Sequence, residues 1–261
     1  MTTDAGGASA AATGTATYVY GVVRAREAPK IDAAGVAGRP VRSVTEGDLA
    51  AIVGDVDAGF VEAGREDLER HLAVLEQAAL SATVVPLRFG TVMPDDAAVT
   101  TELLRGRTAE LEEMLAALDG RVELSLTGTY EERVLGEVVA EQPEVAALRE
   151  RVRTHDEAAT YYDRIRLGEL VANAMAAKRE RDTEQVLAKL RPLADDVHLG
   201  DVAHERSVLS ASFLVHRDRL PDFDRAAEEV AAANRSRIRF RYAGPLPPYD
   251  FVGGGKAGPW G

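Results

Sequence analysis

The sequence contains no cysteine in 261 residues, which excludes disulfide bonds, thiol catalysis and cysteine-based zinc or iron–sulfur sites. It also has no uninterrupted apolar run approaching the roughly 18 residues that a membrane span needs. The first 16 residues carry neither the basic start nor the leucine-rich core of a signal peptide, and we expect them to form a disordered tail. These absences predict a soluble protein of the cytoplasm.

The common catalytic and phosphate-binding motifs are missing as well. No GxxxxGK, GxGxxG or GxSxG pattern occurs, and the Gly253–Lys256 run lacks the strand-to-helix context of a phosphate loop, so we interpret it as a flexible tail. The five histidines do not have the spacing of an HExxH zinc site. The acidic pairs Asp95–Asp96 and Asp195–Asp196 stand where helices or strands are expected to begin, and capping explains them. We therefore expect no enzyme activity, no metal and no cofactor.

The charge balance argues against a protein whose whole surface binds nucleic acid or an anionic membrane. There are 43 acidic and 31 basic residues, which gives a formal charge of −12. A chain of 261 residues with 46% apolar content can bury a sizeable core, and its length favours two domains.

The first half has the pattern of a mixed α/β domain over residues 17–119. Continuous apolar runs predict strands at Tyr18–Val23 and Leu49–Val53. Leu68, Leu72, Leu75 and Ala79 have helical spacing and predict a helix over 65–80, and a second helix is expected at 96–118. Between them, 83–92 is expected to be a strand that Pro86 confines to an edge or a bulge.

The second half, 120–243, predicts the element order β-α-β-β-α-β, which is typical of a ferredoxin-like domain. Residues 121–130 alternate as in a half-exposed strand. A polar connecting segment and a long helix over 156–190 follow. In this helix a stripe of residues at helical spacing should share one face: Tyr161, Ile165, Gly168, Ala172 and Met175. The remaining elements are expected at 197–202, 207–216, 221–234 and 236–243. We predict an α+β protein of two domains, with a proline-rich segment and tail at 244–261.

An alternating row of arginines in the last strand is the most distinctive charged pattern. Arg235, Arg237, Arg239 and Arg241 should share one face, with apolar residues on the other. Three interpretations fit: an RNA-binding platform, docking to an acidic protein partner, and pairing with carboxylates of neighbouring helices. The aromatic RNP-type motif is absent, which disfavours RNA. For Arg88, within an apolar run, we expect a structural ion pair.

The segment GPLPPYDFV, Gly244–Val252, has three prolines within four residues. Prolines cannot continue a regular strand or helix, so we expect a sharp turn there. The turn should fix Tyr249 and Phe251 against the body of the protein.

Six blocks of the sequence resemble, in this order, those of the gas vesicle GvpL/GvpF family. They are YVYGV (18–22), EGDLAAIV (46–53), HLAVLE (71–76), VPLRFGTV (85–92), VLSASFLV (208–215) and GPLPPYDF (244–251). PLRFGT and GPxPPY are the specific blocks, and the resemblance extends over about 17–252. Departures are Leu246 where the family often has tryptophan, Ser210 where asparagine is usual, and Ser125–Gly128 where a more aromatic strand end is common.

The resemblance implies a non-enzymatic, minor prokaryotic gas vesicle protein with an N-terminal α/β domain and a ferredoxin-like C-terminal domain. It implies binding to the shell protein GvpA and to other accessory Gvp proteins, limiting GvpA aggregation during nucleation of the vesicle. The alternative is a ferredoxin-like small-molecule or RNA-binding module. The motif residues with expected structural or interaction roles are Tyr20, Gly21, Pro86, Leu87, Arg88, Phe89, Gly90, Phe213, Gly244, Pro245, Pro247, Pro248, Tyr249 and Phe251.

Overall fold

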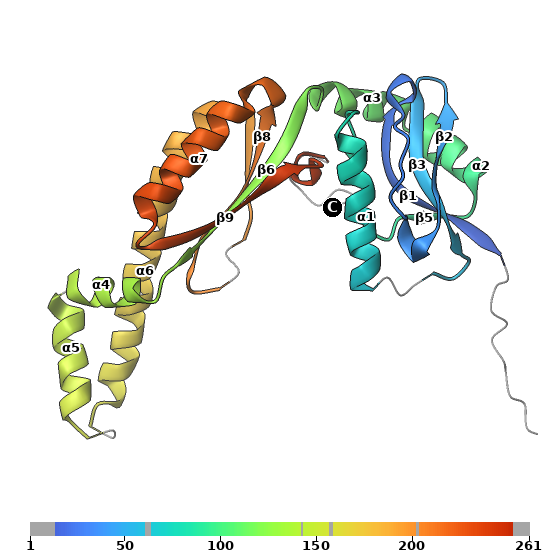
Figure 1. The fold of residues 1–261 in the computed structure, drawn as a ribbon. Helices are drawn as coiled ribbons and strands as arrows, with labels where there is room; N and C mark the ends of the chain where they lie inside the picture. Colours follow the sequence, from blue (N-terminus) through green and yellow to red (C-terminus); the bar gives the residue numbers. More distant parts are fainter. Residues whose placement is uncertain (1–13, 61–63, 142, 157–158, 202–203, 253–261) are drawn as a thin grey trace, which may run out of the picture. The chain divides into compact units, whose positions relative to one another are not determined.

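The computed structural model describes residues 14–60, 64–141, 143–156, 159–201 and 204–252 (Figure 1). Residues 1–13 of the predicted tail and the Gly253–Lys256 run lie outside them. The chain divides into two compact units. The first unit comprises Met1–Val122 with Pro245–Gly261, and the second unit comprises Glu123–Gly244.

The first unit is built on an antiparallel sheet with the strand order β2-β3-β1-β4, in which β5 also pairs with β1. The strands are β1 (Thr15–Arg24), β2 (Val41–Glu46), β3 (Leu49–Asp57), β4 (Val85–Pro86) and β5 (Val92–Met93). β1 and β3 are buried along most of their length because helices cover both faces of the sheet. β1 begins inside the predicted tail, and the sequence pattern missed β2.

Helices lie on opposite faces of this sheet, with α1 on one side and α2 on the other (Figure 1). α1 spans Arg65–Ala79, and its buried side chains are His71, Val74, Leu75 and Ala78. Leu68 is 40% exposed, so the buried face is rotated from the predicted one. The single helix expected at 96–118 is wrong: α2 (Asp96–Ala98), a π-helix (Val99–Arg105) and α3 (Thr108–Ala117) follow one another. Asp95 caps α2, since its carboxylate accepts from the Ala98 N–H.

The strand expected at 83–92 is also interrupted. β4 ends at Pro86, and β5 begins at Val92. Between them Gly90 adopts φ of +88°, and the Thr91 N–H donates to the Arg88 carbonyl at 3.1 Å. This turn ends the hydrogen-bonded pairing of β4 with β1, so Arg88 lies in a turn and not within an apolar strand. Pro86 lies on an edge strand, where its missing N–H is tolerated.

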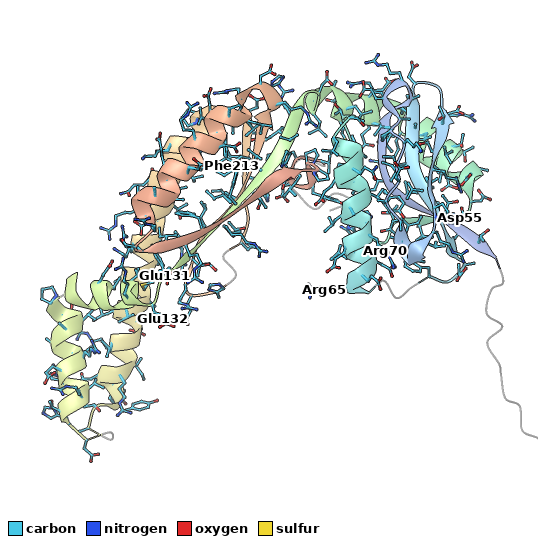
Figure 2. The ribbon with its side chains drawn as sticks, viewed as in Figure 1. Asp55, Arg65, Arg70, Glu131, Glu132 and Phe213 are labelled. Carbon is cyan, nitrogen blue, oxygen red and sulfur yellow. The ribbon has the colours of Figure 1, made fainter. Side chains whose placement is uncertain are left out.

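The second unit contains an antiparallel sheet with the strand order β7-β8-β6-β9. Its strands are β6 (Arg121–Tyr130), β7 (Asp196–Leu199), β8 (Ser207–His216) and β9 (Ile238–Leu246), and its helices are α4 (Arg133–Glu141), α5 (Pro143–Thr154), α6 (Tyr161–Leu190) and α7 (Leu220–Asn234). α6 and α7 both contact β8 and each other. The core between them contains Phe213, which meets Phe223 of α7 edge-on at 5.1 Å between ring centroids (Figure 2).

The segment predicted as a polar connection is helical. α4 and α5 occupy it, and both pack on the part of α6 that extends past the sheet (Figure 1). α6 starts five residues after the predicted helix start at 156. The helix predicted at 221–234 is confirmed by α7.

Candidate interaction surfaces

The predicted turn lies within Gly244–Val252, but the expectation that the prolines cannot continue a strand is wrong for the start of this segment. β9 runs through Pro245 to Leu246, and proline is accepted because β9 is an edge strand. Gly244 has φ of +144°, and an added Cβ would lie 2.6 Å from Leu124 Cδ2, so only glycine fits. The turn follows at Tyr249–Phe251, where the Tyr249 N–H donates to the Pro247 carbonyl at 2.8 Å.

His71 joins this block to the core of the first unit. Its Nδ1 lies 3.0 Å from the Tyr18 hydroxyl, and its Nε2 lies 2.5 Å from the Tyr249 hydroxyl. The Tyr18 hydroxyl also accepts from the Gly90 N–H at 2.9 Å. The imidazole is fully buried, and burial lowers the pKa of His71 to about 4, against an opposing contribution from the Leu87 backbone. His71 is therefore neutral at pH 7.

Aromatic rings surround this histidine. Tyr20 stacks on it at 5.5 Å between ring centroids, and Phe89 meets it edge-on at the same separation. The Tyr20 hydroxyl accepts from the Val36 N–H at 2.7 Å, and burial raises the pKa of Tyr20 to about 12. We call His71, Tyr18, Tyr20, Phe89 and Tyr249 the His71 cluster. His71, Tyr18 and Tyr20 are buried, and Phe89 and Tyr249 are partly buried, so the contacts among these side chains hold separate segments of the first unit together.

Other motif residues support the same cluster. At Gly21 an added Cβ would lie 2.8 Å from the Val85 carbonyl oxygen, so β1 and β4 approach closely only with glycine there. The buried Leu87 donates its N–H to the Tyr20 carbonyl at 2.8 Å. Pro247 and Pro248 are buried, Phe251 is half-buried, and the Arg88 side chain is exposed. Four of the six blocks thus meet at His71. From the sequence, the histidines are considered only as possible zinc ligands and this role is not predicted, although His71 opens the HLAVLE block.

Replacing Tyr249 with phenylalanine tests the bond to His71. We expect Tyr249→Phe to lower the free energy of unfolding by about 1 kcal/mol, because the ring keeps its packing and one buried hydrogen bond is lost. Tyr162→Phe, on a side chain that is 83% exposed, is the control and should change nothing measurable in urea denaturation. Equal urea concentrations at the unfolding midpoints of Tyr249→Phe and wild type would contradict a stabilising role for the hydrogen bond between Tyr249 and His71.

The four arginines of the predicted row have different surroundings. Arg237 donates from Nη2 to Asp182 at 2.8 Å, and Asp182 also accepts from the Tyr130 hydroxyl at 2.7 Å. Arg239 pairs with Glu131 at 3.0 Å. Arg235 and Arg241 are exposed, and Arg235 precedes the strand, which begins at Ile238. The row is therefore divided between a half-buried ion pair, a surface pair and exposed cations.

The predicted stripe on α6 is largely exposed instead of forming core. Tyr161 is 60% and Ile165 47% exposed. Further along the helix, a groove of about 670 Å³ is lined by Gly168, Val171, Ala172 and Met175 from α6 and by residues 130–132 and 205–206 opposite. We call this the α6 groove. The α6 side of this groove is mostly apolar, which is typical of binding sites for apolar groups.

Arg179 stands at the end of the α6 groove. Its Nη2 donates to the Glu205 carbonyl at 2.9 Å, while its buried Nε has no hydrogen-bond acceptor within the described part of the chain. A buried donor without an acceptor costs free energy, and a bound ligand that supplied an oxygen would remove that cost.

A family model described as gas vesicle synthesis protein GvpL/GvpF matches residues 16–253. The chain belongs to the GvpL/GvpF family. A gas vesicle protein F from Streptomyces sp. (strain CB03234) is 36% identical over 240 residues, covering 90% of this chain and 99% of the relative. A gas vesicle protein L from the same strain is 31% identical over 254 residues, covering 90% and 92%. The family resemblance found in the six blocks is thereby confirmed.

Solved GvpF structures have the same fold. The crystal structure of GvpF from Anabaena sp. PCC7120 matches with a TM-score of 0.78 and 26% identity, covering 92% of this chain and 98% of that one. GvpF from Microcystis aeruginosa matches in fold with a TM-score of 0.73, covering 90% and 98%. Neither the family description nor the names of these relatives indicates an enzymatic role.

The described part of this GvpL/GvpF chain contains neither a candidate metal-binding cluster nor a helix that could cross a membrane. Across the described ranges, three or more histidine, aspartate or glutamate side chains do not gather in an arrangement able to hold a metal ion. Among the helices that the structure describes, none is long and apolar enough to cross a membrane.

Proposed function

We propose that this protein is a minor component and assembly factor of the gas vesicle that binds the shell protein GvpA and other accessory Gvp proteins. In this role it limits aggregation of GvpA during nucleation. A protein that coats a gas space must carry a large apolar surface before assembly, and such surfaces aggregate unless another molecule covers them. We further infer that the second unit is ferredoxin-like, which its element order and the strand order β7-β8-β6-β9 support.

The α6 groove is the observation that carries the proposal. It combines an apolar side formed by α6 with an exposed apolar approach along Tyr161 and Ile165, on a helix face that α4 and α5 do not occupy at those positions. Binding of an apolar helix in a groove is a recurring mode of protein recognition. The RNA alternative receives less support, because Arg237 and Arg239 contact carboxylates instead of forming a free cationic row.

Ala172→Glu tests this surface. Ala172 is exposed and lines the α6 groove, so a glutamate there should disturb the fold little while placing a charge on the apolar side of the groove. We expect the wild-type chain to keep co-expressed GvpA soluble and to retain it in a pull-down. Ala172→Glu should lower the retained GvpA by about tenfold, an effect equivalent to about 1.4 kcal/mol.

Ala177→Glu is the matched control, since Ala177 is exposed on the same helix and lines no groove described above. It should bind GvpA as wild type does. Failure of the wild-type chain to bind GvpA or to slow its aggregation would remove the proposed function. Equal binding by wild type and Ala172→Glu would leave GvpA binding intact but move it away from the α6 groove.

A further inference from the structure

Four arginines from separate segments of the second unit surround one hollow of about 770 Å³. Arg133 is the first residue of α4, Arg206 precedes β8, Arg235 follows α7 and Arg239 lies in β9. Glu131 and Glu132 line the same hollow where the chain passes from β6 to α4 (Figure 2). We call these six residues the basic hollow. Folding of the unit brings these residues together, because 106 positions separate Arg133 from Arg239 in the sequence.

The basic hollow carries more positive charge than its own carboxylates neutralise. Glu131 pairs with Arg239 at 3.0 Å, and Glu132 lies 3.6 Å from Arg206. Within the described part of the chain, Arg133 and Arg235 have no carboxylate within ion-pairing distance, and both are exposed. Four guanidiniums against two carboxylates leave a charge of +2, in a chain whose total is −12. The hollow can therefore attract a negative group even though the chain as a whole is acidic.

The basic hollow adjoins the α6 groove, since Glu131, Glu132 and Arg206 line both. A segment whose apolar side chains lie along Val171, Ala172 and Met175 would bring its next residues to the arginines. Guanidinium groups bind carboxylates with two parallel hydrogen bonds, which suits recognition of aspartate or glutamate side chains. The two hollows together match an amphipathic segment with acids at one end.

We infer that the basic hollow binds the carboxylate side chains of an acidic protein segment whose neighbouring apolar side chains occupy the α6 groove. The chemistry favours a peptide over nucleic acid, because the positive charge is confined to a short stretch and the acidic remainder of the chain offers no continuous track for a phosphate backbone. This inference adds an acidic charge pattern to the partner of the proposed function. It rests on the proposed function only where it places apolar side chains in the α6 groove.

The test uses a synthetic helical peptide of about 20 residues, roughly 30 Å long, with leucines spaced by three and four and three glutamates after the last leucine. Calorimetric titration into the full chain should give binding that weakens in about 0.3 M salt. The double variant Arg133→Ser, Arg235→Ser should bind about fivefold or more weakly. The same peptide with lysines in place of the glutamates should not bind detectably.

Arg149→Ser with Arg181→Ser is the matched control, because both arginines are exposed in the same unit and line neither hollow. It removes the same charge and should bind the peptide as wild type does. No binding by wild type, or equal loss in the two double variants, would overturn the inference. Tighter binding of a single-stranded RNA than of the peptide, lost in Arg133→Ser, Arg235→Ser, would overturn it in favour of a nucleic-acid site. Because the peptide is not GvpA, these results are independent of the co-expression experiment.

Discussion

Replacing Arg237 with serine is expected to lower the free energy of unfolding by about 3–5 kcal/mol. The Asp182 side chain is only 7% exposed, and Arg237 is its cationic partner at 2.8 Å. Without Arg237, the buried carboxylate of Asp182 would lose its cationic partner. Of the contacts described above, it would keep only the hydrogen bond from the Tyr130 hydroxyl. Breaking a buried pair by removing one member is costly because the other charge stays out of water.

Arg239→Ser is the control for this experiment. Arg239 is 78% exposed, and its pair with Glu131 should contribute less than about 1 kcal/mol. Urea denaturation of the full-length variants gives both values under the same conditions. Losses of similar size in the two variants would show that burial does not distinguish these neighbouring arginines.

A double-mutant cycle separates pairing from packing at this site. Asp182→Asn removes the negative charge and keeps a group able to bond the Tyr130 hydroxyl. Arg237→Ser should therefore cost clearly less in the Asp182→Asn background than in wild type. Additive losses would mean that the charge of Asp182 is not what makes Arg237 necessary.

Acid should destabilise the first unit through His71, by about 3 kcal/mol between pH 6.5 and pH 4. The pKa of His71 is lowered to about 4 in the folded chain, against about 6.5 in the unfolded chain. Between these values the unfolded state binds the proton and the folded state does not. The contribution of neutral His71 to the free energy of unfolding is therefore fully present above pH 6.5 and is lost as the pH falls toward 4.

His71→Gln isolates this effect from the titration of carboxylates. We expect the variant to be less stable than wild type at pH 7, because the hydrogen bonds to Tyr18 and Tyr249 change, but position 71 no longer titrates. The stability difference between wild type and His71→Gln should shrink by about 3 kcal/mol as the pH is lowered from 6.5 to 4. A difference that stays constant over this range would show that His71 does not have a depressed pKa.

The His71 cluster explains why sequence blocks far apart in the chain belong together. YVYGV, HLAVLE, VPLRFGTV and GPLPPYDF supply a strand, a helix face, a turn and a C-terminal strap that share one buried histidine. Their role in the described geometry is to hold the first unit together. The surfaces that we propose for partner binding are instead the α6 groove and the basic hollow of the second unit.

Local patterns in the sequence determined several elements of this protein. The continuous apolar runs of β1 and β3 predicted strands, and their burial follows from cover on both faces of the sheet. Alternation predicted β6, and Pro221 and Asn234 marked the ends of α7. The six blocks indicated the family that the comparisons confirm.

Only the tertiary structure decided which faces are covered. Periodicity groups Tyr161, Ile165 and Ala172 on one side of α6, but all three are exposed in the structure, and Ala172 lines the α6 groove opposite the end of β6. In α1 the buried side chains include His71, because this side chain contacts β1 and Tyr249, which lies 178 residues away in the sequence. Arg237 and Arg239 differ because Asp182 is buried whereas Glu131 is partly exposed, and these partners come from 55 and 108 residues away in the sequence. Spacing along the chain sets which residues share a face, whereas burial and pairing depend on segments that meet only after folding.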